Sequence, residues 1–141
     1  MDFKFAKCKP NAVAPTKAYS CDTGYDLTIL DIVKDYGRTK LYGTGIKIEP
    51  PENIYFDIVP RSSISKTGYI LANSVAVIDS SYRGELLIAL TKIDNSKPDL
   101  TLPMRIAQLV PRNLLKLEPT EVIEDELTST IRNTDGFGST G

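Results

Sequence analysis

Histidine is absent from the sequence, which removes the side chain that most often serves as a general base and as a zinc ligand. Tryptophan is absent as well, and the only two cysteines, Cys8 and Cys21, follow no metal-binding spacing. Because no signal-like apolar run opens the sequence, we expect both to be free thiols in a reducing compartment: the cytoplasm or, for a eukaryotic or viral protein, the nucleus. Any catalysis must then use carboxylates, hydroxyls, Lys or Arg, with a hard metal ion such as Mg²⁺.

An excess of charge of either sign is also lacking, since 17 Lys and Arg face 18 Asp and Glu and the net charge is −1. Without a basic surplus there is no electrostatic footprint for long nucleic acid, so any phosphate binding must be local. The longest apolar runs fall far short of a membrane span. We therefore expect neither nucleic acid nor a membrane as a partner, and 141 residues suit one domain with its own core.

Short alternating or β-branched runs separated by turn signals predict an all-β protein, a single-domain jelly-roll-like β-barrel. The runs cover residues 2–7, 40–48, 54–59, 69–71, 74–78, 85–93 and 106–117. Prolines, among them Pro60 and Pro111, are expected to end or bend strands. One short helix is expected after Ser62, with a serine capping its first turn. The acidic residues 120–127 are expected to form a loop or a helical turn.

The last eleven residues, 131–141, are unsuited to a core, because three glycines within six residues make a continuous helix or strand costly. Backbone N–H groups of this stretch and the hydroxyls of Ser139 and Thr140 are free to wrap an anion, and Phe137 would act as a lid over a flat base. The alternative is an ordinary frayed terminus. We expect residues 1–130 to form the barrel and 131–141 a mobile arm that closes over the active site.

Four polar or glycine-containing blocks interrupt the predicted strands. They are Gly-Tyr-Asp-Leu at 24–27, Pro-Arg-Ser-Ser at 60–63, the stretch 73–85 with Val-Ile-Asp-Ser-Ser-Tyr-Arg-Gly-Glu at its end, and Arg-Ile-Ala-Gln-Leu at 105–109. With Gly-Phe-Gly-Ser-Thr-Gly at 136–141 as block five, their types and order resemble the five motifs of the homotrimeric dUTP pyrophosphatases, or dUTPases. The resemblance implies hydrolysis of dUTP to dUMP and pyrophosphate, which limits uracil incorporation into DNA and supplies dUMP for thymidylate synthesis.

Within block three, the resemblance assigns Asp79 and Tyr82 to catalysis and sugar recognition. Asp79 would accept the 3′-hydroxyl and act as general base for a water that attacks the α-phosphorus. Tyr82 would pack against the deoxyribose and leave no room for a 2′-hydroxyl, so that UTP is refused. From the residues alone, Asp79 could instead start a turn and Tyr82 could be a surface aromatic.

Uracil recognition in the family comes from a β-hairpin whose backbone groups mimic a complementary base, and residues 73–78 match it. Asn73, Val77 and Ile78 are therefore expected at the base, although Asn73 also suits an ordinary turn and the two apolar residues suit a core or an interface. A main-chain donor and acceptor reject cytosine because they would be left unpaired. Ala76 departs from the glycine usual at its position.

Phosphate recognition would be distributed over the other blocks. The resemblance implies hydrogen bonds from Ser62, flanked by Arg61 and Ser63 at the start of the short helix. Gln108 would reach the α-phosphate, unless it only satisfies a strand edge. Arg132, which precedes Phe137 at the family spacing, would neutralise the γ-phosphate.

The arm and the metal complete the implied site. Phe137 would cover the uracil, while Gly138, Ser139 and Thr140 would bind phosphate oxygens. Asp26 in block one would face Mg²⁺ through its water shell, because Mg²⁺ usually keeps several waters beside triphosphate oxygens.

The resemblance also implies a homotrimer with dUTP as its ligand, in which each site takes blocks one, two and four from one subunit, block three from a second and the arm from the third. The chain departs from the family pattern at Pro103 and Met104, at Ser63, and at Asn133 and Asp135 in the arm. Two alternatives remain open. A deaminase of the same fold would need a glutamate that residues 86–92 do not supply, and the other alternative is a non-catalytic nucleotide sensor.

Overall fold

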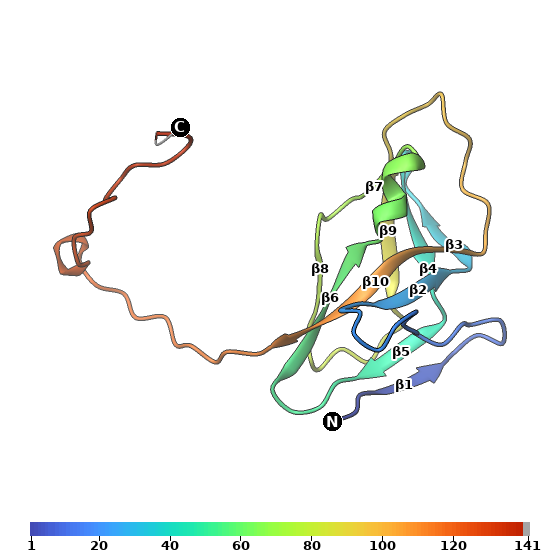
Figure 1. Ribbon diagram of the computed structural model, residues 1–141, viewed down its shortest axis with the longest axis horizontal. Helices are drawn as coiled ribbons and strands as arrows, with labels where there is room; N and C mark the ends of the chain where they lie inside the picture. Colours follow the sequence, from blue (N-terminus) through green and yellow to red (C-terminus); the bar gives the residue numbers. More distant parts are fainter. Residues whose placement is uncertain (140–141) are drawn as a thin grey trace.

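The structure is a computed structural model in which residues 1–139 are described. One four-stranded sheet has the order β2 (Tyr25–Ile29), β10 (Met104–Asn113), β6 (Ile54–Pro60), β8 (Ala76–Ile78). The other has the order β3 (Asp31–Asp35), β4 (Thr39–Gly43), β9 (Leu87–Lys92), β7 (Tyr69–Leu71), and β1 (Lys4–Lys7) pairs with β5 (Ile46–Glu49). All pairs are antiparallel and form one body (Figure 1), which confirms the all-β, jelly-roll-like prediction.

The core lies between the two larger sheets, because alternate residues of their strands point to the same side. Leu27, Ile58 and Leu109 come from the first sheet, and Ile88 and Leu90 come from β9 in the second. All five are at most 1% exposed and belong to one hydrophobic cluster. This packing holds the ends of β2, β6 and β10, where several of the predicted site residues lie, on a rigid support.

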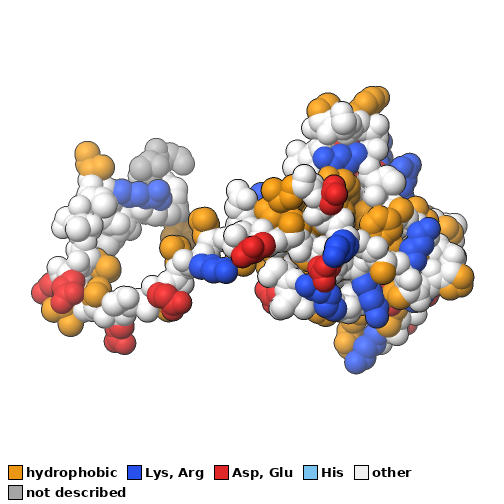
Figure 2. Space-filling view, turned by 90° about the horizontal axis from the view of Figure 1, so that it is seen from below, with side chains coloured by type: hydrophobic (Ala, Val, Ile, Leu, Met, Phe, Trp, Pro, Cys, Tyr) orange, Lys and Arg blue, Asp and Glu red, His pale blue; other side chains and the backbone are white. Residues whose placement is uncertain are grey.

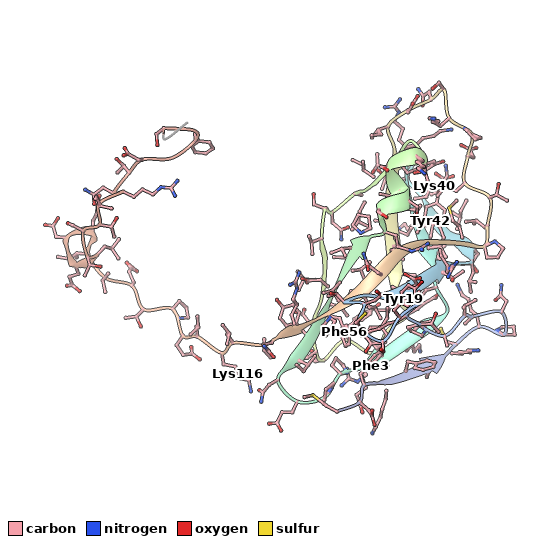
Figure 3. The ribbon with its side chains drawn as sticks, viewed as in Figure 1. Phe3, Tyr19, Lys40, Tyr42, Phe56 and Lys116 are labelled. Atoms are coloured by element: carbon pink, nitrogen blue, oxygen red, sulfur yellow. The ribbon has the colours of Figure 1, made fainter. Side chains whose placement is uncertain are left out.

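The N-terminal segment closes one end of this core. The ring of Phe3 packs edge to face against Phe56 at 4.9 Å and against Tyr25 at 5.2 Å between ring centroids (Figure 3). Phe3, which the predicted run 2–7 placed in a strand, thus lies just ahead of β1 and contributes to the barrel through its ring.

Two strands escaped the sequence analysis, and one predicted strand is divided. β2 was missed because the glycine and aspartate of 24–27 had marked that segment as a functional block rather than a strand, and β3 because its five residues are all exposed and show no apolar alternation. The predicted run 40–48 separates into β4 and β5 at Thr44 and Gly45. Gly45 has a φ of 69°, which favours glycine, and the buried Thr44 hydroxyl donates to the Leu86 carbonyl at 2.8 Å.

Pro60 ends a strand, whereas Pro111 does not. Pro60 is the last residue of β6, while β10 continues through Pro111 to Asn113, in line with the predicted run 106–117. The ladder between β10 and β2 stops at Leu109, and only β6 remains as a neighbour beyond it. A missing N–H is tolerated there because one side of the strand has become an edge.

Both predicted helical segments are present as short 3₁₀ turns, η1 (Ser62–Lys66) and η2 (Glu124–Glu126). The expected serine cap of the first is wrong: Arg61 precedes the first turn in an extended conformation, and its side chain makes no capping hydrogen bond. Within residues 1–139, no helix is long and apolar enough to cross a membrane. Cys8 and Cys21 are both free and exposed, as expected.

The C-terminal segment leaves the barrel after Leu114, whose N–H donates to the Asn53 carbonyl at 2.9 Å. Figures 1 and 3 show the chain extending away from the body from this point, with Lys116 near its start. The extended segment is thus longer than the 131–141 arm expected from composition. Its apolar side chains are exposed, from 67% to 113%, at Leu115, Leu117, Ile123, Leu127, Ile131 and Phe137.

Candidate functional site

Blocks one, two and four meet at one end of the first sheet. Asp26 on β2 lies directly opposite Gln108 on β10, and Gln108 lies opposite Val59 near the end of β6. Arg61 follows that end, and its Nε lies 3.1 Å from Asp26 Oδ1. Ser62 and Ser63 come next, exposed in the first turn of η1. Four predicted binding residues and the predicted metal residue are therefore brought together by strand register.

A second arginine belongs to this cluster, and the sequence analysis gave it no role. Arg105 Nη1 lies 3.7 Å from Asp26 Oδ2, so the carboxylate stands between two guanidinium groups and is 16% exposed. Arg105 itself is 60% exposed and is free to turn toward an incoming anion. The signal in the sequence that could have identified Arg105 is its position as a charged residue at the start of the apolar run of block four.

Gln108 is held between Gly24 and Pro60. Its Nε2 donates to the Pro60 carbonyl at 3.1 Å. One amide hydrogen is therefore used to satisfy a backbone carbonyl of the neighbouring strand, as expected if Gln108 satisfies a strand edge. The second amide hydrogen is left for another acceptor. A methyl group at Gly24 would overlap the Gln108 side chain, so Gly24 is required for the close approach of β2 to this amide.

Gly24→Ala should displace the Gln108 amide from Pro60 and weaken binding of the dUTP that the sequence resemblance implies, without unfolding the barrel. The overlap involves a flexible side chain, so the amide can move aside and we expect an increase in KM of about tenfold with little change in kcat. Steady-state kinetics with pyrophosphate detection would measure it. Gly37→Ala is the control, because no atom lies within 4 Å of a methyl group there, although its φ of 100° requires a check of the melting temperature. An unchanged KM for Gly24→Ala would contradict the expected contact between Gln108 and the α-phosphate.

Block three does not form the expected β-hairpin. β7 pairs with β9 in one sheet and β8 pairs with β6 in the other, so the connecting turn at Asn73 crosses from sheet to sheet. The turn is closed by Ser74 N–H donating to the Leu71 carbonyl at 3.1 Å. Because β8 is an edge strand, one row of its backbone groups lacks a strand partner within residues 1–139. Val77 is 61% exposed on this strand.

Asp79 and Tyr82 lie in the turn that follows β8. Asp79 is exposed at a hollow of about 540 Å³ lined also by Tyr55, Val77 and Asn113. Tyr82 N–H donates to the Asp79 carbonyl at 3.0 Å and closes the turn between these two residues. The hollow therefore carries the Asp79 carboxylate and the ring of Tyr55, whereas Tyr82 follows in the same turn without lining it.

Strand register separates this depression from the arginine cluster. Ile78 lies opposite Phe56, so Asp79 is level with Tyr55 at the beginning of β6, whereas Arg61 follows its end. The six residues from Tyr55 to Arg61 correspond to about 20 Å at the rise of a β-strand. A single chain therefore does not bring Asp79 to the arginine cluster.

The arm residues are also remote from both groups. Phe137 is fully exposed, and Arg132 Nε donates to the carbonyl of Asp135 within the arm itself at 2.6 Å. Gly138 has a φ of 81°, which favours glycine, and Ser139 is exposed. The predicted role of Thr140 lies outside the described residues. Figure 2 shows the arm separated from the body, on which acidic and basic side chains are interspersed.

A family profile and two curated relatives of this chain carry the same description. A family profile for dUTPases matches residues 10–141. Two curated relatives are the deoxyuridine 5′-triphosphate nucleotidohydrolase of Crocosphaera subtropica, 37% identical over 100% of this chain and 99% of the relative, and that of Clostridium novyi, 38% identical over 96% and 95%.

Solved structures agree with these relatives on the fold. A mutant dUTPase of Staphylococcus bacteriophage 80alpha with dUpNHpp superposes with a TM-score of 0.83 at 24% identity, covering 99% of this chain and 98% of the other. A mutant dUTPase from phage phi11 of S. aureus, described with a structural Mg(II) ion, has a TM-score of 0.75 at 21% identity, covering 90% and 100%.

Proposed function

The chain belongs to the dUTPase family and is a dUTP nucleotidohydrolase, and we propose how its own residues perform the reaction. Asp79 takes a proton from a water whose oxygen attacks the α-phosphorus of dUTP. The bond between the α-phosphorus and the oxygen that bridges to the β-phosphate breaks, so that dUMP and pyrophosphate are formed. The reaction removes a precursor of uracil in DNA and supplies dUMP for thymidylate synthesis.

The observation that carries this proposal is the convergence of blocks one, two and four on one end of the first sheet. Arg61 and Arg105 supply two guanidinium groups, and Gln108 supplies an amide hydrogen beside them. Ser62 and Ser63 add exposed hydroxyls from η1. Charge-assisted hydrogen bonds of this kind suit a triphosphate, whose charge they neutralise while the α-phosphorus is attacked.

Recognition of the nucleoside is assigned to block three. The free edge of β8 at Val77 and Ile78, with the turn at Asn73, offers backbone donors and acceptors to uracil. Such groups reject cytosine because a mismatched edge leaves them unpaired at about 1–3 kcal/mol each. Tyr82 packs on the deoxyribose and excludes a 2′-hydroxyl, while Asp79 accepts the 3′-hydroxyl.

Mg²⁺ fits this site through water rather than by direct ligation. Within the part of the chain that the structure describes, no group of three or more metal-ligating side chains occurs. Both oxygens of Asp26 face guanidinium groups, which disfavours direct ligation by this carboxylate, so it would contact only the water shell of an ion that substrate phosphates hold. When bound, Mg²⁺ supplies neutralisation of the triphosphate charge.

A homotrimer with shared sites resolves the separation of Asp79 from the arginine cluster. The two groups lie about 20 Å apart along β6, too far for one dUTP to reach both within a chain. A second subunit would supply block three to the cluster of the first, and the arm of a third would add Arg132, Phe137, Gly138, Ser139 and Thr140. The exposed apolar side chains of residues 115–139 are consistent with a segment that is covered by a neighbour.

The proposal is tested by incubating the protein with dUTP, dCTP, dTTP and UTP in the presence of Mg²⁺ and assaying pyrophosphate and ammonia separately. We expect pyrophosphate from dUTP alone, because β8 reads uracil and Tyr82 blocks ribose. Ammonia from dCTP would show a deaminase instead. Turnover of UTP comparable to that of dUTP would contradict the role of Tyr82.

A further inference from the structure

Tyr82 is held in place by the residues that immediately follow it. Its hydroxyl donates to the carbonyl of Glu85 at 2.9 Å. A methyl group at Gly84 would overlap the tyrosine ring, so the ring lies directly against the backbone of that residue. The position of the ring therefore depends on where the peptide of Glu85 is fixed.

Glu85 is held at two points: the peptide that carries its carbonyl donates the Leu86 N–H to the Ile46 carbonyl at 2.8 Å, and its carboxylate reaches across to the N-terminal half of the chain. Its Oε2 accepts the N–H of Gly45 at 2.8 Å and lies 2.8 Å from Lys9 Nζ. Lys9 Nζ also donates to Asp31 Oδ1 at 2.9 Å. Burial lowers the pKa of Lys9, but hydrogen bonds to Glu85 and Asp31 and their charges outweigh it, so the pKa is raised and the lysine stays charged.

The three charged side chains are packed tightly over Gly43 on β4. A methyl group at Gly43 would overlap Lys9, Asp31 and Glu85 at once. The side chains of Lys9 and Glu85 are only 25% and 20% exposed, unlike the surface pair of Lys4 and Glu49. A partly buried, hydrogen-bonded ion pair holds its members more firmly than a surface pair does.

We propose that Lys9 is a positioning residue for sugar discrimination: its ion pair with Glu85 fixes the carbonyl that holds Tyr82 against the deoxyribose. The inference rests on the proposed role of Tyr82 and adds to it a residue outside all five blocks. Loss of the pair lets the loop of residues 79–85 relax, and the space denied to a 2′-hydroxyl opens. Lys9 itself touches no substrate.

The test compares the ratio of kcat/KM for dUTP to kcat/KM for UTP in the full-length protein and in Lys9→Met. We expect this ratio to fall about tenfold, the scale of coupling between residues of one network. Lys92→Met is the matched control, because Lys92 is 20% exposed and pairs with Asp99 at 2.7 Å, in a pair that does not touch Tyr82 or Glu85. Its ratio should stay at the wild-type value, whatever either lysine contributes to stability.

Tyr82→Phe and the double variant with Lys9→Met complete the cycle. If Lys9 acts through the tyrosine hydroxyl, the two substitutions together should lower the ratio no more than the larger single one. Additive losses, or an equal loss in Lys92→Met, would overturn the proposal. If Tyr82→Ala lowers the ratio but Lys9→Met leaves it unchanged, the proposal is also overturned. If Tyr82→Ala itself leaves the ratio unchanged, the assigned role of Tyr82 is overturned instead.

Glu85→Gln keeps the proposal testable if Lys9→Met does not fold. The amide still accepts the N–H of Gly45 but no longer carries the charge that Lys9 needs. The same fall in the dUTP to UTP ratio is expected, and a wild-type ratio in this folded variant would reject the inference.

Discussion

Asp79→Asn should lower kcat for dUTP by about 10²-fold or more, the scale expected when a positioned general base is lost. Asparagine keeps the size of the side chain but cannot take a proton from water at neutral pH. The side chain is exposed, so the fold and much of the affinity for a non-hydrolysable dUTP analogue should survive. Single-turnover pyrophosphate release and analogue titration would separate the two effects.

Asp35→Asn is the control for this substitution. Asp35 is likewise exposed and lies beside a turn, where it accepts the N–H of Gly37 at 2.7 Å, but it belongs to β3 in the other sheet. Its turnover should match the wild-type protein. If Asp79→Asn also turns over at the wild-type rate, the water is activated elsewhere, and Asp26 becomes the next carboxylate to examine.

Deleting residues 133–141 should leave a folded protein that hydrolyses dUTP very slowly, with kcat/KM reduced by about 10²- to 10³-fold, because the deletion removes the groups proposed to bind phosphate and to cover the base. No described side chain in this stretch is buried, so the melting temperature of the barrel should be unaffected. Differential scanning calorimetry and steady-state kinetics would give the two values. A truncated protein with full activity would show that the arm is an ordinary frayed end.

Phe137→Trp distinguishes loss of the lid from loss of length. The indole would be the only tryptophan in the chain, so its fluorescence reports the arm alone. The signal should change on addition of a non-hydrolysable dUTP analogue and stay constant with the UTP analogue. An equal response to both analogues, or none to either, would contradict closure of the arm over the base.

Mixed assemblies decide whether the arm and block three come from different subunits. Neither the truncated chain nor Asp79→Asn should be active alone. Hybrid trimers of the two can assemble an intact site from Asp79 of a truncated subunit and the arm of another, so activity should reappear. Demonstrated hybrids that stay inactive would favour an arm that folds back onto its own subunit.

Local patterns in the sequence were sufficient for the class of fold and for many of its elements. Tyr69–Leu71 was predicted to the residue, and the other predicted runs overlap strands, because alternation of apolar side chains is a property of neighbouring residues. β2 was missed because Asp26 and Gly24 suggested a functional block, although the same segment also forms a strand. The predicted run 106–117 already passed through Pro111, but the edge that tolerates this proline, left where the ladder with β2 stops at Leu109, is contained in no local pattern.

Five ordered blocks in the sequence by themselves determined the family and the reaction, because each block needs only a few residues of defined type at short spacing. Only the tertiary structure decided which blocks can act together. Strand register joins Asp26 to Gln108 and Arg61, adds Arg105, and leaves Asp79 about 20 Å away along β6. The pairing of Lys9 with Glu85 is likewise a tertiary contact, because the two residues lie 76 positions apart and meet only where the sheets bring their segments together.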